Sequence, residues 1–170
     1  MWRKRSKYFV RLISLLLVLP LSGCGTEGKA EEEHTVGVFA MGTYMTLTAY
    51  GESAEAALTI SEDRIKELEA LWSTTDENSD IYKVNQSGGA RTEVSEETAE
   101  ILQFAIDMAE QTGGFLDPTI SPVVTAWGFI SGEYYIPTEN ELTDLLRNVD
   151  YEKVLLEGNF VTLPDGMHIL

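Results

Sequence analysis

Three short segments hold most of the residue types that could bind a ligand or take part in chemistry. Residues 40–43 have the sequence AMGT, residues 73–80 have STTDENSD, and residues 112–129 have TGGFLDPTISPVVTAWGF. In the first, glycine would let the backbone approach a ligand closely and threonine offers a hydroxyl, although a β-bulge is the ordinary alternative. In the second, hydroxyl and amide side chains could bind a polar ligand or could form local turns.

The third segment joins a helix stop to a turn fixed by proline and then to an aromatic pair. Asp117 could accept hydrogen bonds from an N–H group of a heterocycle, while Phe115 and Trp127 could supply apolar walls. The alternative is a helix end at the double glycine, followed by a turn and a tryptophan of the core. Both interpretations remain open from these residues alone.

Several mechanisms lack the motifs that they need. The sequence has no GxxxxGK[ST], no GxGxxG after a strand, no CxxC and no HExxH. The two histidines, His34 and His168, stand far apart, so a paired zinc site is unsupported. Ser121 and Ser131 lack the context of a nucleophile elbow, which makes hydrolysis by a Ser-His-Asp triad unattractive.

The charge of the chain limits its partners. The formal net charge of the 170 residues is −16, and from Cys24 onward seven basic residues face 28 acidic ones, which gives −21. Such a surface repels phosphate backbones, so nucleic acid is excluded as a partner. An anionic nucleotide would need a metal ion or backbone N–H groups to offset the same repulsion.

The N-terminus predicts the compartment. Residues 1–23 combine a basic start with an apolar run that is too short to span a bilayer, which indicates a signal peptide. Residues 21–24, LSGC, resemble a bacterial lipobox in which Cys24 receives lipid, palmitate included; an ordinary cleaved signal is the alternative. Two acyl chains would anchor the protein stably, and residues 24–34 would form an acidic tether. We therefore expect a lipid-anchored protein on the extracytoplasmic face of the cell membrane.

The remaining patterns predict the elements that position the three segments. Residues 35–51 favour one strand or two, broken near Gly42, and residues 52–72 favour an amphipathic helix. A second helix is predicted from the N-cap Ser95 to the glycines at 113–114, and a third after a capping box at Thr138. Residues 73–89 are predicted to form a polar loop.

The end of the chain predicts a hairpin and a further strand. Residues 153–163 suggest two strands around residues 157–159, and residues 167–170 look like a strand that stops abruptly, as in a fragment. Strands followed by single helices with hairpin-like returns favour an α+β domain over residues 35–170, rather than a βαβ succession.

Taken together, these segments resemble the ApbE family of membrane-anchored FAD:protein FMN transferases. The matching elements are the lipobox, MGT at 41–43, the helix that leads into LWSTTDENSDIYKVN, and residues 112–129, in that order. The resemblance implies an α+β fold in which packed helices cover a mixed sheet, and a site for FAD.

The resemblance also implies the positions of the ligand contacts. Met41 would lie against FAD and Thr75 would face the flavin, although many family members carry an aromatic residue there and threonine cannot stack. The wall after the double glycine would consist of Phe115, Leu116 and Asp117. Thr119 and Trp127 match the motif as supports of this wall.

The implied reaction moves FMN from FAD to a threonine of an acceptor protein and releases AMP, with Mg²⁺ neutralising the pyrophosphate. The family motif DLGGIAKGY and the magnesium-binding positions are expected beyond Leu170, so the chain would be truncated at its C-terminus and inactive alone. The alternatives are an Mg²⁺-dependent FAD pyrophosphatase, a lipoprotein that binds FAD or another solute without chemistry, and an acidic structural lipoprotein.

Overall fold

The computed structural model describes residues 31–170. The predicted signal peptide at 1–23, the predicted lipidation of Cys24 and most of the predicted tether at 24–34 lie outside the described residues. Strand β1 (Glu33–Ala40) begins within the last residues assigned to the tether. No helix among residues 31–170 has both the length and the apolar character needed to cross a bilayer.

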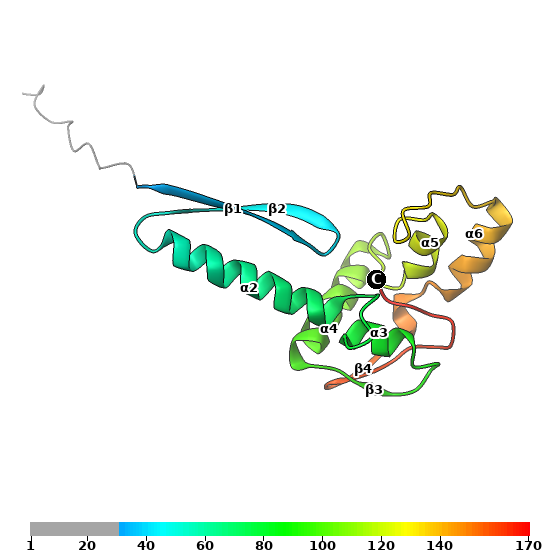
Figure 1. The fold of residues 1–170 in the computed structure, drawn as a ribbon. Helices are drawn as coiled ribbons and strands as arrows, with labels where there is room; N and C mark the ends of the chain where they lie inside the picture. The colour runs from blue at the N-terminus through cyan, green and yellow to red at the C-terminus, as the bar shows by residue number, and fades with distance from the viewer. Residues whose placement is uncertain (1–30) are drawn as a thin grey trace, which may run out of the picture.

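An antiparallel hairpin and a long helix form the N-terminal part of the fold. Strand β1 pairs along its whole length with β2 (Thr43–Tyr50), and α2 (Ala54–Trp72) runs back beside the hairpin (Figure 1). Val38 and Ala40 are buried while the residues that alternate with them are exposed. One face of the hairpin therefore packs on α2 and the other meets solvent.

A second, three-stranded sheet and two helices surround the main core. The sheet has the order β3 (Thr92–Glu93), β5 (Phe160–Thr162), β4 (Leu155–Glu157), and both pairs are antiparallel. Helices α3 (Asp80–Asn85) and α4 (Glu96–Thr112) pack against it. The buried core cluster consists of Ile81, Val84, Val94, Ala99, Leu102, Val154, Val161, Leu163, Met167 and Ile169.

Short helices complete the chain. Helix α5 (Ser121–Ala126) contacts helix α6 (Glu139–Leu145), and α6 lies at the end of the molecule remote from the hairpin (Figure 1). Two 3₁₀ turns, η1 (Leu146–Asn148) and η2 (Tyr151–Lys153), then lead to β4. These elements confirm the predicted α+β class.

Helix caps and glycine turns lie where the sequence predicts them. The hydroxyl of Ser95 accepts from Thr98 N at the start of α4, and Gly113 ends that helix with φ +64°. Thr138 forms the predicted capping box with Glu141. Each of these features is local, so the residues involved are sufficient to specify it.

Three elements differ from the predictions. The polar loop predicted for 73–89 contains α3, because Ile81 and Val84 on one face of this turn and a half are buried in the core. Residues 112–129 contain α5 in addition to a turn. The strand predicted at 167–170 is reduced to one parallel bridge, between His168 and Ile120.

A half-buried carboxylate ties α3 to the cap of α4. Asp80 Oδ2 accepts hydrogen bonds from Ser95 N and Thr98 Oγ1, both at 2.8 Å. Burial by itself raises the pKa of Asp80, but the hydrogen bonds from Ser95 and Thr98 and the charge of Lys83 outweigh it, and the pKa is lowered.

Asp80→Asn is expected to reduce the free energy of unfolding at pH 7 by about 1–2 kcal/mol, because hydrogen bonds to a charged acceptor are replaced by weaker ones. Since the folded pKa lies below the unfolded one, this stabilisation is complete above the unfolded value and is lost as the pH falls through the folded value. Urea unfolding of both forms at neutral and acid pH measures the difference, with the exposed Asp63→Asn as control. If the difference in free energy of unfolding between the wild type and Asp80→Asn stays the same at acid pH, the ionised form of Asp80 has no role in stability.

Candidate functional site

A cleft of about 460 Å³ lies where the three segments meet. It is formed by the turn of the hairpin, the C-terminal end of α2, the loop after that helix and the residues that follow α5. Its lining residues are Met41, Gly42, Glu69, Trp72, Ser73, Thr74, Thr75, Phe129 and Ile130. The volume is in the usual range for a small-molecule site.

The turn between β1 and β2 forms one edge of the cleft. Met41 and Gly42 have φ values of +52° and +67°, as in a type I′ hairpin turn, which confirms the predicted break near Gly42. The left-handed conformation costs a residue with a side chain about 1–2 kcal/mol. The N–H of Met41 donates a hydrogen bond to Glu69 Oε1 at 2.7 Å, which links the turn to the end of α2.

The loop after α2 forms a second edge and is organised by its own hydroxyl groups. Ser73 Oγ accepts from the backbone N–H groups of Thr75 at 3.1 Å and Asp76 at 3.0 Å, and it lies 3.2 Å from Thr75 Oγ1. Ser79, the N-cap of α3, donates to the carbonyl of Ser73. These contacts hold Thr75 exposed at the cleft with its hydroxyl beside Ser73.

The predicted wall after the double glycine lies away from the lining of this cleft. Phe115 is 98% exposed and Leu116 is 43% exposed. Asp117 Oδ1 accepts from Thr119 N at 2.8 Å and from Thr119 Oγ1 at 2.6 Å, and Oδ2 accepts from Tyr151 N at 3.2 Å. The structure thus brings Met41 and Thr75 together and places Asp117 in a backbone-binding network. A ligand role for Phe115, Leu116 and Asp117 remains a prediction.

Four lining residues were not predicted as ligand contacts: Glu69, Trp72, Phe129 and Ile130. Phe129 belongs to the aromatic pair of the third segment, and its ring packs edge-on against Tyr134 with centroids 5.8 Å apart. Glu69 is one of 28 acidic residues and belongs to no motif, so no pattern could have distinguished it.

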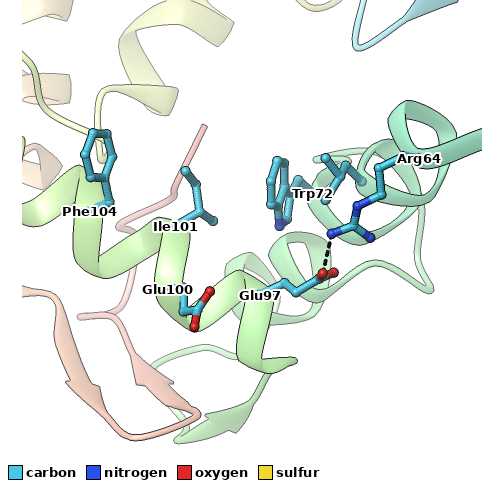
Figure 2. A pocket seen from close by; sticks show the side chains of 7 residues that line it. Arg64, Trp72, Glu97, Glu100, Ile101 and Phe104 are labelled. Carbon is cyan, nitrogen blue, oxygen red and sulfur yellow. Dashed lines mark hydrogen bonds and ion pairs between the residues drawn. The ribbon is translucent and has the colours of Figure 1, made fainter. Parts of the chain in front are cut away.

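Trp72 borders the cleft and also a second groove. That groove, of about 300 Å³, lies between α2 and α4 and includes Arg64, which pairs with Glu97, and the exposed Phe104 (Figure 2). Trp72 Nε1 is buried and has no hydrogen-bond partner among the described residues. A buried indole N–H without an acceptor is unfavourable.

The described residues hold no cluster of metal ligands. Among residues 31–170 no group of three or more His, Cys, Asp and Glu side chains is arranged to hold a metal ion.

The chain belongs to the ApbE family, whose model matches residues 41–169. It is similar to the FAD:protein FMN transferase of Haemophilus influenzae, with 29% identity over 157 residues that cover 87% of this chain and 44% of that protein. It is also similar to the FAD:protein FMN transferase of Vibrio cholerae, with 30% identity over 155 residues, 87% of this chain and 46% of that protein.

Solved structures agree with this assignment. The ApbE protein of Thermotoga maritima superposes with a TM-score of 0.74 at 28% identity, over 81% of this chain and 47% of that chain. The flavin transferase ApbE of Vibrio cholerae gives a TM-score of 0.71 at 25% identity, over 82% of this chain and 48% of that chain. The predicted ApbE-like fold is therefore confirmed, and the chain spans about half the length of the relatives that it matches.

Proposed function

We propose that the protein is an FAD:protein FMN transferase and that the cleft beside the hairpin turn holds the flavin end of FAD. The observation that carries the proposal is the meeting of Met41 and Thr75 in one cleft, in a chain of the ApbE family. The relatives named above carry this activity in their names.

The cleft suits a planar, apolar ring system with hydrogen-bond acceptors at its edge. Met41, Phe129 and Ile130 border it with exposed apolar surface, and an isoalloxazine ring would remove that surface from water. The indole of Trp72 borders the same cleft and adds aromatic surface to it. Thr75 offers a hydroxyl and cannot stack on the ring. The aromatic side chains that line the cleft are those of Trp72 and Phe129.

In the proposed reaction the threonine hydroxyl oxygen of an acceptor protein attacks the FMN phosphorus of FAD. The P–O bond to the AMP phosphate breaks, the new Oγ–P bond forms, AMP leaves, and the hydroxyl proton passes to solvent or to the departing phosphate. The described residues bind and orient the flavin end and exclude water, which would otherwise compete as the nucleophile. Residues 31–170 carry no cluster of ligands for Mg²⁺, which would supply the positive charge beside the pyrophosphate.

We also propose that the protein is exported and anchored to the membrane through a lipidated Cys24, with the acceptor protein on the same, extracytoplasmic side. The support is the signal-like start and the LSGC sequence at 21–24. The mass of the protein extracted from membranes tests this, because the mature chain should begin at Cys24 with its lipid.

The purified chain is expected to bind FAD and FMN and to bind AMP much more weakly, because the cleft would contact the flavin end. Calorimetric titration with each compound measures this. Tighter binding of AMP than of FMN would contradict the placement of the flavin.

Transfer is tested on the full-length gene product with FAD, Mg²⁺ and a peptide that contains threonine. Mass spectrometry of the peptide should show the addition of FMN, and a chelator should abolish it. Release of AMP without labelled peptide would favour an FAD pyrophosphatase. Bound but intact FAD would favour a binding lipoprotein, and no flavin dependence at all would favour a structural one.

A further inference from the structure

Two locally unfavourable features lie next to each other at the edge of the cleft. Met41 adopts a left-handed conformation that residues with side chains rarely occupy. Glu69 places an acidic side chain in the last turn of α2, where the helix dipole favours cations and where no basic residue occurs. The type I′ turn requires the left-handed conformation but favours asparagine, aspartate or glycine over methionine, and the helix end does not favour Glu69.

A single hydrogen bond joins these features. Met41 N donates to Glu69 Oε1 at 2.7 Å, across 28 positions of sequence. Hydrogen bonds to an ionised carboxylate are short and stronger than neutral ones, and this one has the length of that class. Both residues line the cleft.

Within the described part of the chain, the other polar contacts between the hairpin and α2 lie at the end of the hairpin opposite the turn. Among residues 31–170, β1 and β2 pair only with each other, so no further strand fixes them. The inner face packs on α2 through side chains such as Val38 and Ala40. At the end opposite the turn, Ala54 N donates to Gly51 O and His34 Nδ1 lies 3.5 Å from Glu55 Oε1. The bond from Glu69 therefore ties the turn itself to the end of α2.

We propose that Glu69 is a positioning residue that holds the turn of Met41 and Gly42 in the place where it contacts the flavin. This inference rests on the proposed function, because it names the residue that prepares one edge of the same site. Glu69 acts through Met41. Its carboxylate is used as a hydrogen-bond acceptor, which glutamine can also provide.

The test compares the purified wild-type chain with Glu69→Ala and Glu69→Gln. We expect the alanine variant to bind FAD about tenfold more weakly, and the glutamine variant to recover most of the affinity because it retains a carbonyl acceptor. Glu67→Ala, an exposed acid of the same helix outside the cleft, should leave the affinity unchanged. The melting temperatures of all variants should stay close to that of the wild type.

Hydrogen exchange at the Met41 amide gives a second measurement that requires no ligand. We expect faster exchange in Glu69→Ala than in the wild type, and near-normal protection in Glu69→Gln. Unchanged exchange in the alanine variant would overturn the inference, as would a glutamine variant that binds FAD no better than alanine. If the wild type fails to bind FAD while the exchange result holds, the proposed function is wrong and the positioning role of Glu69 is retained.

Discussion

Gly128→Ala is expected to reduce the free energy of unfolding by about 3 kcal/mol or more and to abolish FAD binding. Gly128 is buried and has φ +81°, and a Cβ atom there would lie 1.9 Å from the carbonyl oxygen of Glu133, 2.6 Å from its carbonyl carbon and 3.0 Å from the Cα of Tyr134. All three atoms belong to the backbone, so no side-chain rotation can relieve the contact. The loop at 128–134 must therefore open.

The loop matters for the cleft because it carries Phe129 and Ile130. It is closed by hydrogen bonds from Gly132 N to Gly128 O at 2.8 Å and from Tyr135 N to Trp127 O at 3.2 Å. Opening it would displace the two apolar side chains that face the hairpin turn across the cleft. Stability and ligand binding should consequently fall together.

Gly132→Ala is the matched control. Gly132 lies in the same loop with φ +76°, but a Cβ atom there would have no other atom within 4 Å. The free energy of unfolding of this variant should fall only by the cost of an alanine in the left-handed conformation, about 1–2 kcal/mol. The variant should keep most of its affinity for FAD. Urea unfolding and FAD titration of both variants measure the contrast. Equal losses of stability and FAD affinity in Gly128→Ala and Gly132→Ala would show that the backbone contacts around Gly128 do not cause the effect.

The elements that could be predicted from the sequence are those with local causes. The hairpin follows from alternating residues around Gly42, and α4 follows from a Ser95 cap, an apolar stripe and the αL glycine at 113. Helix α3 could not be predicted in this way, because it has only six residues among polar neighbours. Its stability depends on the burial of Ile81 and Val84 in a core that distant segments complete.

The same division applies to the candidate site. The motifs identified the segments that meet at the cleft, and Met41 and Thr75 both line it. The pairing of Glu69 with Met41 could not be predicted, since a contact over 28 positions depends on how the hairpin packs on α2. Likewise, local sequence does not determine which way Phe115 faces once the chain leaves α4.

Asp117→Ala is expected to reduce the free energy of unfolding by about 2–4 kcal/mol, because it removes the acceptor of three hydrogen bonds. These come from the backbone N–H and hydroxyl of Thr119 and from the backbone N–H of Tyr151. Thr119 is fully buried and its Oγ1 also accepts from Asp150 N at 2.8 Å. The carboxylate thus joins the turn after α4 to η2, and each buried N–H left without a partner costs about 1–3 kcal/mol.

A double-mutant cycle with Thr119→Val separates this structural role from a ligand role. If the two side chains act in one network, the double variant should lose at least about 1 kcal/mol less than the sum of the single losses, as measured by urea unfolding. The free energy of unfolding of Asp117→Asn should lie between those of the wild type and Asp117→Ala, because asparagine keeps one acceptor oxygen but turns its amide N–H₂ toward a donor. If Asp117 served only a ligand, alanine would weaken FAD binding and leave unfolding unchanged. The network predicts that stability falls even when no flavin is present.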